Sequence, residues 1–251
     1  MPRPSSAFEE LAGRYDAWYD SAHGRRLFDL EVACLRPLLA PGPGPRLEIG
    51  VGSGRFAGAL GLEVGLDPAV APLRLAAARG VVGVQGTGER LPFSDGAFAA
   101  VVLVLTLCFA DDPAVILGEI RRVLAPSGHL VAGVVPLDSA WGRSCEEQGR
   151  TGHPCYRSAR FLTLAEHCRL LAGAGFSVVG ARSTLTQAPS DEPTEEEALD
   201  GLLARAGFVA LQARTVAGGL GPREGDGPRR GPSSCRPAQE DVGYGRGRQD
   251  D

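Results

Sequence analysis

The chain has 251 residues, of which 43% are hydrophobic, and a formal net charge of −4. This length and composition suit one globular domain, and the absence of a basic excess disfavours a nucleic-acid partner. All 26 basic residues are arginines, which excludes a P-loop lysine, a Schiff-base lysine and the catalytic lysine of short-chain dehydrogenases.

Cysteine usage and hydropathy favour a reducing compartment. The six cysteines contain no Cys-x-x-Cys pair and no repeated spacing, and no apolar signal segment follows Met1. The longest apolar run, residues 97–110, is shorter than the roughly 20 residues that a membrane-spanning helix needs. We therefore expect a cytoplasmic protein without membrane spans.

The first forty residues carry a helical pattern. Apolar and aromatic residues recur at helical spacing from Ala7 to about Leu39, and Gly24 predicts a break between two amphipathic helices. After the Pro/Gly-rich segment 41–45, strands and helices alternate. The expected strands are 46–49, 62–66, 81–84, 98–105, 128–135, 176–184 and 207–213, and the expected helices are 54–60, 69–79, 112–124 and 161–173, with a weaker helical pattern at 195–205.

This alternation predicts an α/β fold. Strands joined by crossover helices form a doubly wound, mostly parallel sheet with helices on both faces. Seven strands are expected, and the last is antiparallel because it follows a long excursion. We divide the chain into an N-terminal helical cap (1–40), the main α/β domain (41–217) and a disordered tail (218–251) rich in Gly, Pro and Arg.

The strongest functional signal is the turn that follows the first strand. The strand ends at Glu48, and alternate glycines at 50, 52 and 54 open the next helix. A turn without Cβ atoms lets the backbone approach a ligand, and the helix N-terminus directs free N–H groups at it. The next strand is followed by Asp67, which completes the pattern of a nucleoside-binding site.

Two nucleoside cofactors fit this turn. Residues 52–57 satisfy the GxGxxA fingerprint of nicotinamide oxidoreductases, and residues 48–54 satisfy the ExGxGxG pattern of S-adenosylmethionine sites. Glu48 favours the second cofactor, because an acid there would repel a pyrophosphate but suits a ligand with a sulfonium and an ammonium group. Two helices also precede the turn, whereas a dinucleotide site normally lies in the first strand of its domain.

Four segments in chain order resemble the motifs of class I S-adenosylmethionine-dependent methyltransferases, in the small-molecule branch with the type 11 domain that includes quinone-biosynthesis enzymes. They are residues 47–54 (LEIGVGSG), 64–68 (VGLDP), 85–93 (QGTGERLPF) and 120–130 (IRRVLAPSGHL). The resemblance implies a Rossmann-like fold and an enzyme that moves a methyl group to an O, N, S or C nucleophile of a small molecule. A nicotinamide oxidoreductase and a non-catalytic S-adenosylmethionine-binding partner protein remain as alternatives.

The resemblance also implies which residues contact the cofactor. Asp67 would hold the ribose hydroxyls. Thr87 stands where the family usually has an aspartate that accepts from the adenine amino group, so a hydroxyl or the backbone would have to replace that contact. The expected cofactor-binding residues are Glu48, Gly50, Gly52, Gly54, Asp67, Pro68, Thr87, Gly88, Glu89 and Leu105.

Acceptor-binding residues are expected on the N-terminal helices and in segment 141–160, which we interpret as a loop. The candidates are Tyr15, Tyr19, Trp141, Tyr156 and Arg157, with His153 as a candidate base. The cysteines and histidines between 145 and 168 lack zinc-ligand spacing, so we expect no metal. The identity of the acceptor and the oligomeric state stay open.

Overall fold

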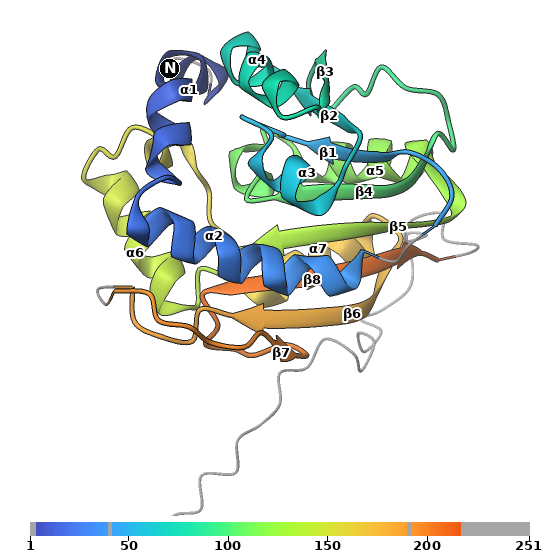
Figure 1. Cartoon of the computed structure of the whole chain (residues 1–251). Coiled ribbons are helices and arrows are strands. Elements are labelled where there is room, and N and C mark those ends of the chain that lie inside the picture. The colour runs from blue at the N-terminus through green and yellow to red at the C-terminus, as the bar shows by residue number, and fades with distance from the viewer. Residues whose placement is uncertain (1–3, 40–41, 190–191, 217–251) are drawn as a thin grey trace, which may run out of the picture.

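The computed structural model describes residues 4–39, 42–189 and 192–216 (Figure 1). The strands are β1 (Arg46–Ile49), β2 (Val64–Asp67), β3 (Val82–Gln85), β4 (Phe98–Val104), β5 (Leu124–Val134), β6 (Phe176–Thr184), β7 (Leu199–Asp200) and β8 (Phe208–Thr215). The α-helices are α1 (Pro4–Trp18), α2 (Ala22–Leu35), α3 (Arg55–Leu60), α4 (Val70–Ala78), α5 (Pro113–Val123), α6 (Ala140–Arg150) and α7 (Leu164–Gly173), and short 3-10 helices are η1 (Arg36–Leu38), η2 (Leu107–Phe109) and η3 (Tyr156–Ser158).

These strands form one eight-stranded sheet in the order β3-β2-β1-β4-β5-β8-β6-β7. The strands from β3 to β5 pair in parallel, whereas β8 is antiparallel to both β5 and β6. The predicted α/β fold with a mostly parallel sheet and an antiparallel last strand is therefore confirmed. The sheet has one strand more than predicted, β7, which has two residues and pairs with β6 at the edge of the sheet. The predicted tail at 218–251 lies outside the described residues.

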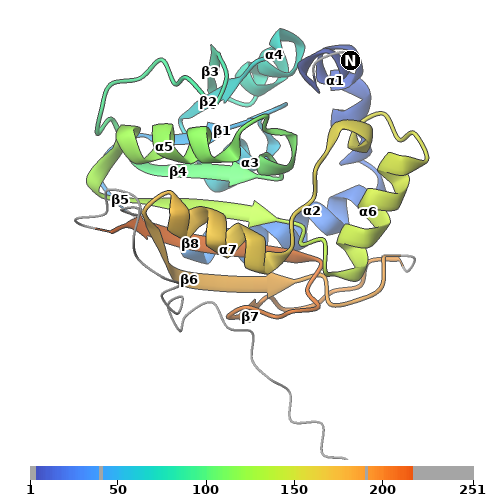
Figure 2. The ribbon, with the colours of Figure 1, turned by 180° about the vertical axis from the view of Figure 1, so that it is seen from behind.

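Helices cover both faces of the sheet (Figures 1 and 2). Helices α2, α3 and α4 pack on one face, and α5 and α7 pack on the other. The central strand β4 shows why its sequence reads as an unbroken apolar run: Val101 and Leu103 belong to one core, and Val102 and Val104 belong to the other. A strand that is buried on both faces has no polar side to display. Within the described ranges, no helix is both long and apolar enough to cross a lipid bilayer.

The N-terminal helices break earlier than predicted. The first helix ends at Trp18, and Ser21 caps the next one by accepting from the Gly24 N–H at 3.0 Å. Gly24 therefore lies inside the first turn of α2 and not at the break. A Cβ on Gly24 would collide with the Trp18 carbonyl oxygen, so the glycine lets the two helices fold back tightly on each other.

The prediction of a loop at 141–160 is wrong for the first half of this segment, which forms helix α6. Ser139 caps this helix by accepting from the Gly142 N–H at 2.9 Å, and Trp141 anchors it in the core with 9% of its surface exposed. The two glycines and the many polar residues of α6 hide the helical spacing of apolar residues by which a helix is recognised in a sequence. The capping serine was the local signal that could have revealed it.

The helical pattern at 195–205 is also wrong, because this segment lies extended along the edge of β6. Arg182 donates to the Ala198 carbonyl oxygen at 2.6 Å, and the Gly201 N–H donates to the Ala181 carbonyl oxygen at 2.8 Å. Glu196 accepts from the hydroxyl of Thr184 at 2.8 Å. The segment thus satisfies the open edge of the sheet, and this tertiary requirement overrides its helix propensity.

We expect Gly24→Ala to lower the free energy of unfolding by about 1–3 kcal/mol, because the added methyl overpacks the joint between α1 and α2. The matched control is Gly13→Ala in the middle of α1, where nothing lies within 4 Å of the added Cβ. That substitution should stabilise the protein by up to about 1 kcal/mol through helix propensity. Urea unfolding measures both, and equal effects of the two substitutions would contradict the proposed collision.

Candidate active site

The turn after β1 contains three glycines with different roles. Their φ values are 71° at Gly50, 51° at Gly52 and 78° at Gly54, a region that side chains rarely adopt. A Cβ on Gly50 would meet the Thr106 side chain at 2.5 Å, and one on Gly54 would meet Ala76 at 2.8 Å. Nothing lies within 4 Å of the Cβ position of Gly52. The outer glycines therefore permit close packing, and the middle one faces open space.

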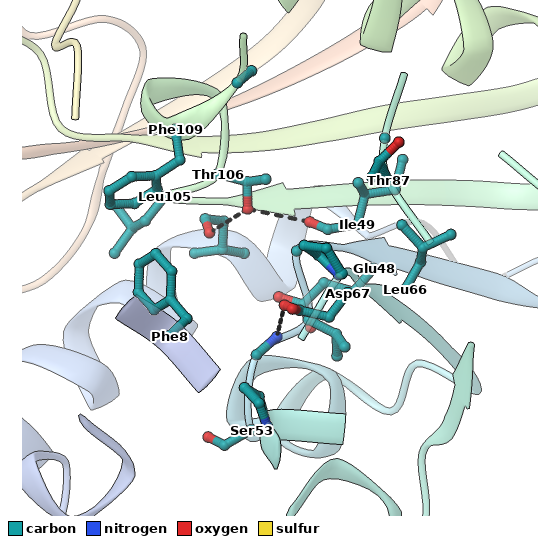
Figure 3. A pocket seen from close by; sticks show the side chains of 18 of the residues that line it. Phe8, Glu48, Ile49, Ser53, Leu66, Asp67, Thr87, Leu105, Thr106 and Phe109 are labelled. Carbon is teal, nitrogen blue, oxygen red and sulfur yellow. Dashed lines mark hydrogen bonds between the residues drawn. The ribbon is translucent and has the colours of Figure 1, made fainter. Parts of the chain in front are cut away.

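This open space is a cavity of about 630 Å³ at the carboxyl ends of the parallel strands, where α/β sheets place their ligands (Figure 3). Most of the residues predicted for the site line it: Tyr15, Tyr19, Glu48, Gly50, Gly52, Asp67, Pro68, Thr87, Gly88, Glu89 and Leu105. Gly54 lies behind the cavity wall as the N-cap of α3.

Other predicted residues lie away from this cavity. Trp141 is turned into the core, where its indole N–H donates to the Gln187 carbonyl oxygen at 2.7 Å. Arg157 is exposed, and His153 stacks on the ring of Tyr156 with 4.5 Å between centroids. Tyr156 lines a second, smaller chamber of about 60 Å³. The structure therefore brings Tyr156, but not Trp141 or Arg157, to a cavity wall.

Glu48 is a buried acid at the floor of the large cavity. Its side chain is 1% exposed, and its Oε2 has no hydrogen-bond partner among the described residues. Burial raises the pKa of Glu48 well above its ordinary value of 4.5, and the nearby charge of Asp67 raises it further, while a bond from the Ala57 backbone lowers it. A buried carboxyl with one oxygen left without a partner suits a positively charged ligand group.

Asp67 is held rigidly at the end of β2. Its Oδ2 accepts from the Gly52 N–H and its Oδ1 accepts from the Ala69 N–H, both at 2.9 Å. Burial raises the pKa of this carboxyl, and these two backbone bonds oppose the rise. Each carboxylate oxygen keeps further acceptor capacity, and the residue lines the cavity. The geometry suits recognition of two neighbouring hydroxyls.

Asp16 fastens α1 to the glycine turn, and the sequence did not single it out for this role. It accepts from the Ser53 hydroxyl at 2.6 Å, from Arg55 Nε at 2.7 Å and from the Arg79 guanidinium at 2.9 Å. Burial alone would raise the pKa of Asp16, but the bonds from Arg55, Ser53 and Arg79 lower it to about 2. Because these partners lie far from Asp16 in the sequence, no local pattern signals the cluster.

Aromatic side chains close the end of the cavity away from Glu48 and Asp67 (Figure 3). Phe8 of α1 meets Phe109 of η2 edge to face, with 5.1 Å between ring centroids, and meets Tyr15 at 6.0 Å. The smaller chamber begins at this wall, since Phe8, Tyr15 and Phe109 line both spaces. The two cavities therefore share an aromatic partition that α1 largely supplies.

Leu105 directly follows β4 and leads the chain into the aromatic end of the cavity. Its φ of 55° places a branched side chain in the left-handed region, where backbone strain is expected. A bond from its N–H to the Gly133 carbonyl oxygen at 2.9 Å holds it there, and it lines both cavities. Strained backbone of this kind clusters at functional sites.

Comparisons with known proteins decide the family. Residues 47–132 match the family model described as a methyltransferase domain. The uncharacterized protein Rv2003c of Mycobacterium tuberculosis is 48% identical over 85% of this chain and 75% of its own length. A structure of an S-adenosylmethionine-dependent methyltransferase of Thermotoga maritima, TM1293, is 33% identical with a TM-score of 0.77, over 84% of this chain and 99% of that one. The chain belongs to the class I S-adenosylmethionine-dependent methyltransferases.

A more distant structure, a geranyl diphosphate C-methyltransferase from Streptomyces coelicolor, was solved in complex with S-adenosyl-L-homocysteine. It is 16% identical with a TM-score of 0.57, over 76% of this chain and 80% of that one, and shares the fold. Because the chain belongs to the S-adenosylmethionine-dependent methyltransferases, its cofactor is S-adenosylmethionine and not a nicotinamide nucleotide. The buried carboxyl of Glu48 at the cavity floor fits such a cationic cofactor.

We expect Asp16→Asn to lower the free energy of unfolding of the methyltransferase by about 2 kcal/mol at pH 7, since it weakens charge-assisted bonds to α3 and α4. The folded pKa of about 2 lies below the ordinary 3.8, so this stabilisation is present above about pH 4 and fades as the pH falls towards 2. The control is Asp20→Asn, whose side chain is 58% exposed and should contribute less than about 1 kcal/mol. Thermal unfolding at several pH values measures both variants, and an equal loss of stability in the two would contradict the role of Asp16.

Glu48→Gln should separate stability from cofactor affinity. Because burial raises the folded pKa of Glu48, its ionisation disfavours the folded state above its ordinary value of 4.5. The glutamine variant without ligand should therefore gain stability over the wild type as the pH rises from about 4.5 to 8. Its affinity for S-adenosylmethionine should fall at least tenfold. Differential scanning fluorimetry and calorimetry measure the two effects, and unchanged affinity would contradict a role for this charge.

Proposed function

We propose that the enzyme transfers the methyl group of S-adenosylmethionine to a nucleophilic atom of a small organic molecule. The observation that carries this proposal is the two-ended cavity, with the acids Glu48 and Asp67 at one end and an aromatic wall at the other. The acidic end suits a cationic nucleoside, and the aromatic end suits a compact organic acceptor. When bound, the cofactor supplies an electrophilic methyl group on a sulfonium centre.

Each part of the acidic end has a proposed role. Glu48 faces the positive charges of the cofactor, and Asp67 accepts from the ribose hydroxyls. The glycine turn, Gly50, Gly52 and Gly54, lets the backbone form the floor. Pro68 and the segment 87–89 (Thr87, Gly88 and Glu89) surround the adenine, and Leu105 separates the cofactor from the acceptor.

The chain contributes mainly position and orientation. Holding the nucleophile near the methyl carbon replaces a bimolecular encounter by a unimolecular step. Helices α1 and α2 act as a cap in this proposal, with Tyr15 and Tyr19 on the acceptor side of the cavity and Tyr156 in the adjoining chamber. His153 lines neither cavity, so a base at that position is not part of the proposal.

Relatives support a small acceptor without fixing its identity. TM1293 is described as a possible histamine N-methyltransferase. A demethylmenaquinone methyltransferase of Lactococcus lactis is 28% identical over 66% of this chain and 61% of its own length. These two descriptions name different acceptors, histamine and demethylmenaquinone, so the acceptor has to be argued from this chain's own residues.

Asp67→Ala should abolish binding of S-adenosylhomocysteine, because it removes the two carboxylate oxygens that the Gly52 and Ala69 N–H groups hold in place at the end of β2. Titration calorimetry should show tight binding to the wild type and none to the variant, and NADH should bind to neither. Asp95→Ala is the control, since Asp95 is an exposed acid that pairs with Arg122 and does not line the cavity. Circular dichroism must show that both variants are folded. Retained binding in Asp67→Ala would overturn the proposed ribose contact.

A further inference from the structure

Glu31 is a second buried acid, and the fold does not explain it. It lies in the middle of α2, between Leu30 and Val32, and is 7% exposed. None of the ion pairs among the described residues includes it. Burial raises the pKa of Glu31 to about 8. An unpaired buried carboxyl costs stability, and a leucine at this position would cost less.

The position of Glu31 connects it with both cavities. Its carboxyl lies close enough to the hydroxyls of Tyr15 and Tyr19 and to the thiol of Cys145 to act on each of them electrostatically. Tyr15 and Tyr19 line the large cavity, and Tyr15 and Cys145 line the small chamber. Glu31 therefore lies on α2 near the aromatic wall, without lining either cavity.

Other titratable groups near Glu31 do not neutralise it. Cys34 on the same helix feels its charge as well, and burial raises the pKa of this thiol to about 12, so it stays protonated. Burial likewise raises the pKa of Tyr15 to about 12 and that of Cys145 to about 11. These neighbours are thus neutral donors near physiological pH. Arg182 and Glu196 also act on Cys34, and the guanidinium of Arg55 lies 5.4 Å from the centre of the Tyr19 ring, where Asp16 and Asp20 pair with it.

Among the described residues, the lining of the small chamber adjoining this wall contains no arginine, and the chain has no lysine. The lining is aromatic, aliphatic and thiol-bearing, with the hydroxyl of Thr106 and the imidazole of His167, and burial lowers the pKa of that imidazole. A carboxylate or phosphate would therefore lie there without a counter-charge, whereas an ammonium group would face the rings of Phe8, Tyr15 and Phe109.

We propose that the methyl acceptor is a primary or secondary amine, which enters as its ammonium ion with the charge in front of the aromatic wall, and that Glu31 near this wall selects it. The inference rests on the proposed methyl transfer and names its acceptor class. Glu31 is a positioning residue, since it lines neither cavity and acts on the ammonium by its charge. The hydroxyl oxygens of Tyr15 and Tyr19 are 3.2 Å apart and hydrogen-bonded.

The reaction then requires one deprotonation. The ammonium loses a proton to solvent, which leaves a lone pair on nitrogen. This lone pair forms the N–C bond to the methyl carbon while the C–S bond breaks and leaves its electron pair on sulfur. The products are a methylated ammonium ion and S-adenosylhomocysteine. Burial raises the pKa of Glu31 to about 8, so its negative charge, and with it the attraction for the ammonium, grows as the pH rises through this value.

The test compares two ligands of similar shape and opposite charge on the protein saturated with S-adenosylhomocysteine. By calorimetry, 2-phenylethylamine should bind the wild type at least tenfold more tightly than 3-phenylpropionate. Glu31→Gln should lose this preference, and Asp29→Asn should keep it, because Asp29 is exposed on the same helix. In the wild type the affinity for the amine should rise from pH 6.5 to 8.5 as Glu31 ionises, and in Glu31→Gln it should stay level.

The inference fails if the acid binds the wild type as tightly as the amine, or if Glu31→Gln keeps the preference and its pH dependence. A purely structural role for Glu31 would change stability without changing this charge selectivity. Thermal unfolding should show Glu31→Gln to be at least as stable as the wild type, because a buried charge is removed. Binding of S-adenosylhomocysteine is measured first, and its absence in the wild type would refute the proposed function and not the acceptor class alone.

Discussion

The carboxylate of Asp16 is the contact on which the architecture of the site depends. Parallel strands and a glycine turn produce an open floor at one edge of the sheet, but they do not produce an enclosed space. Asp16 ties α1 to Ser53 and Arg55 at the turn and to Arg79 at the end of α4. This attachment sets where the aromatic residues of α1 stand, and those residues divide the large cavity from the small chamber.

Three acids near the cavities differ in how much of their charge is compensated. Asp16 is surrounded by donors and has a lowered pKa, so it stabilises the fold. Glu48 and Glu31 are buried without a positive partner among the described residues, so their pKa values are raised and they oppose folding at neutral pH. A protein keeps such groups where a ligand supplies the missing charge. The cost in stability and the affinity for a cationic ligand thus have the same physical origin.

Sequence reasoning succeeded where a local pattern has one physical meaning. Residues 98–105 are apolar because β4 is buried on both faces, and the glycine turn needs its positive φ values whatever surrounds it. It failed where contacts with distant residues determine the local structure. Residues 195–205 lie extended because they follow the edge of β6, and α6 forms because of a capping serine and a buried tryptophan. The Asp16 cluster joins elements far apart in the chain, and Glu31 is unremarkable until α1 and α6 are in place.

The division between floor and cap also bears on how acceptor specificity arises. The match to the methyltransferase domain family spans residues 47–132, which contain the glycine turn, Glu48 and Asp67. Tyr15 and Glu31 precede this region, and Cys145 and Tyr156 follow it. The chamber that we assign to the acceptor is therefore built mainly from segments on either side of the shared unit. Because these residues lie outside the glycine turn, Glu48 and Asp67, substitutions among them can alter the acceptor while cofactor binding is preserved.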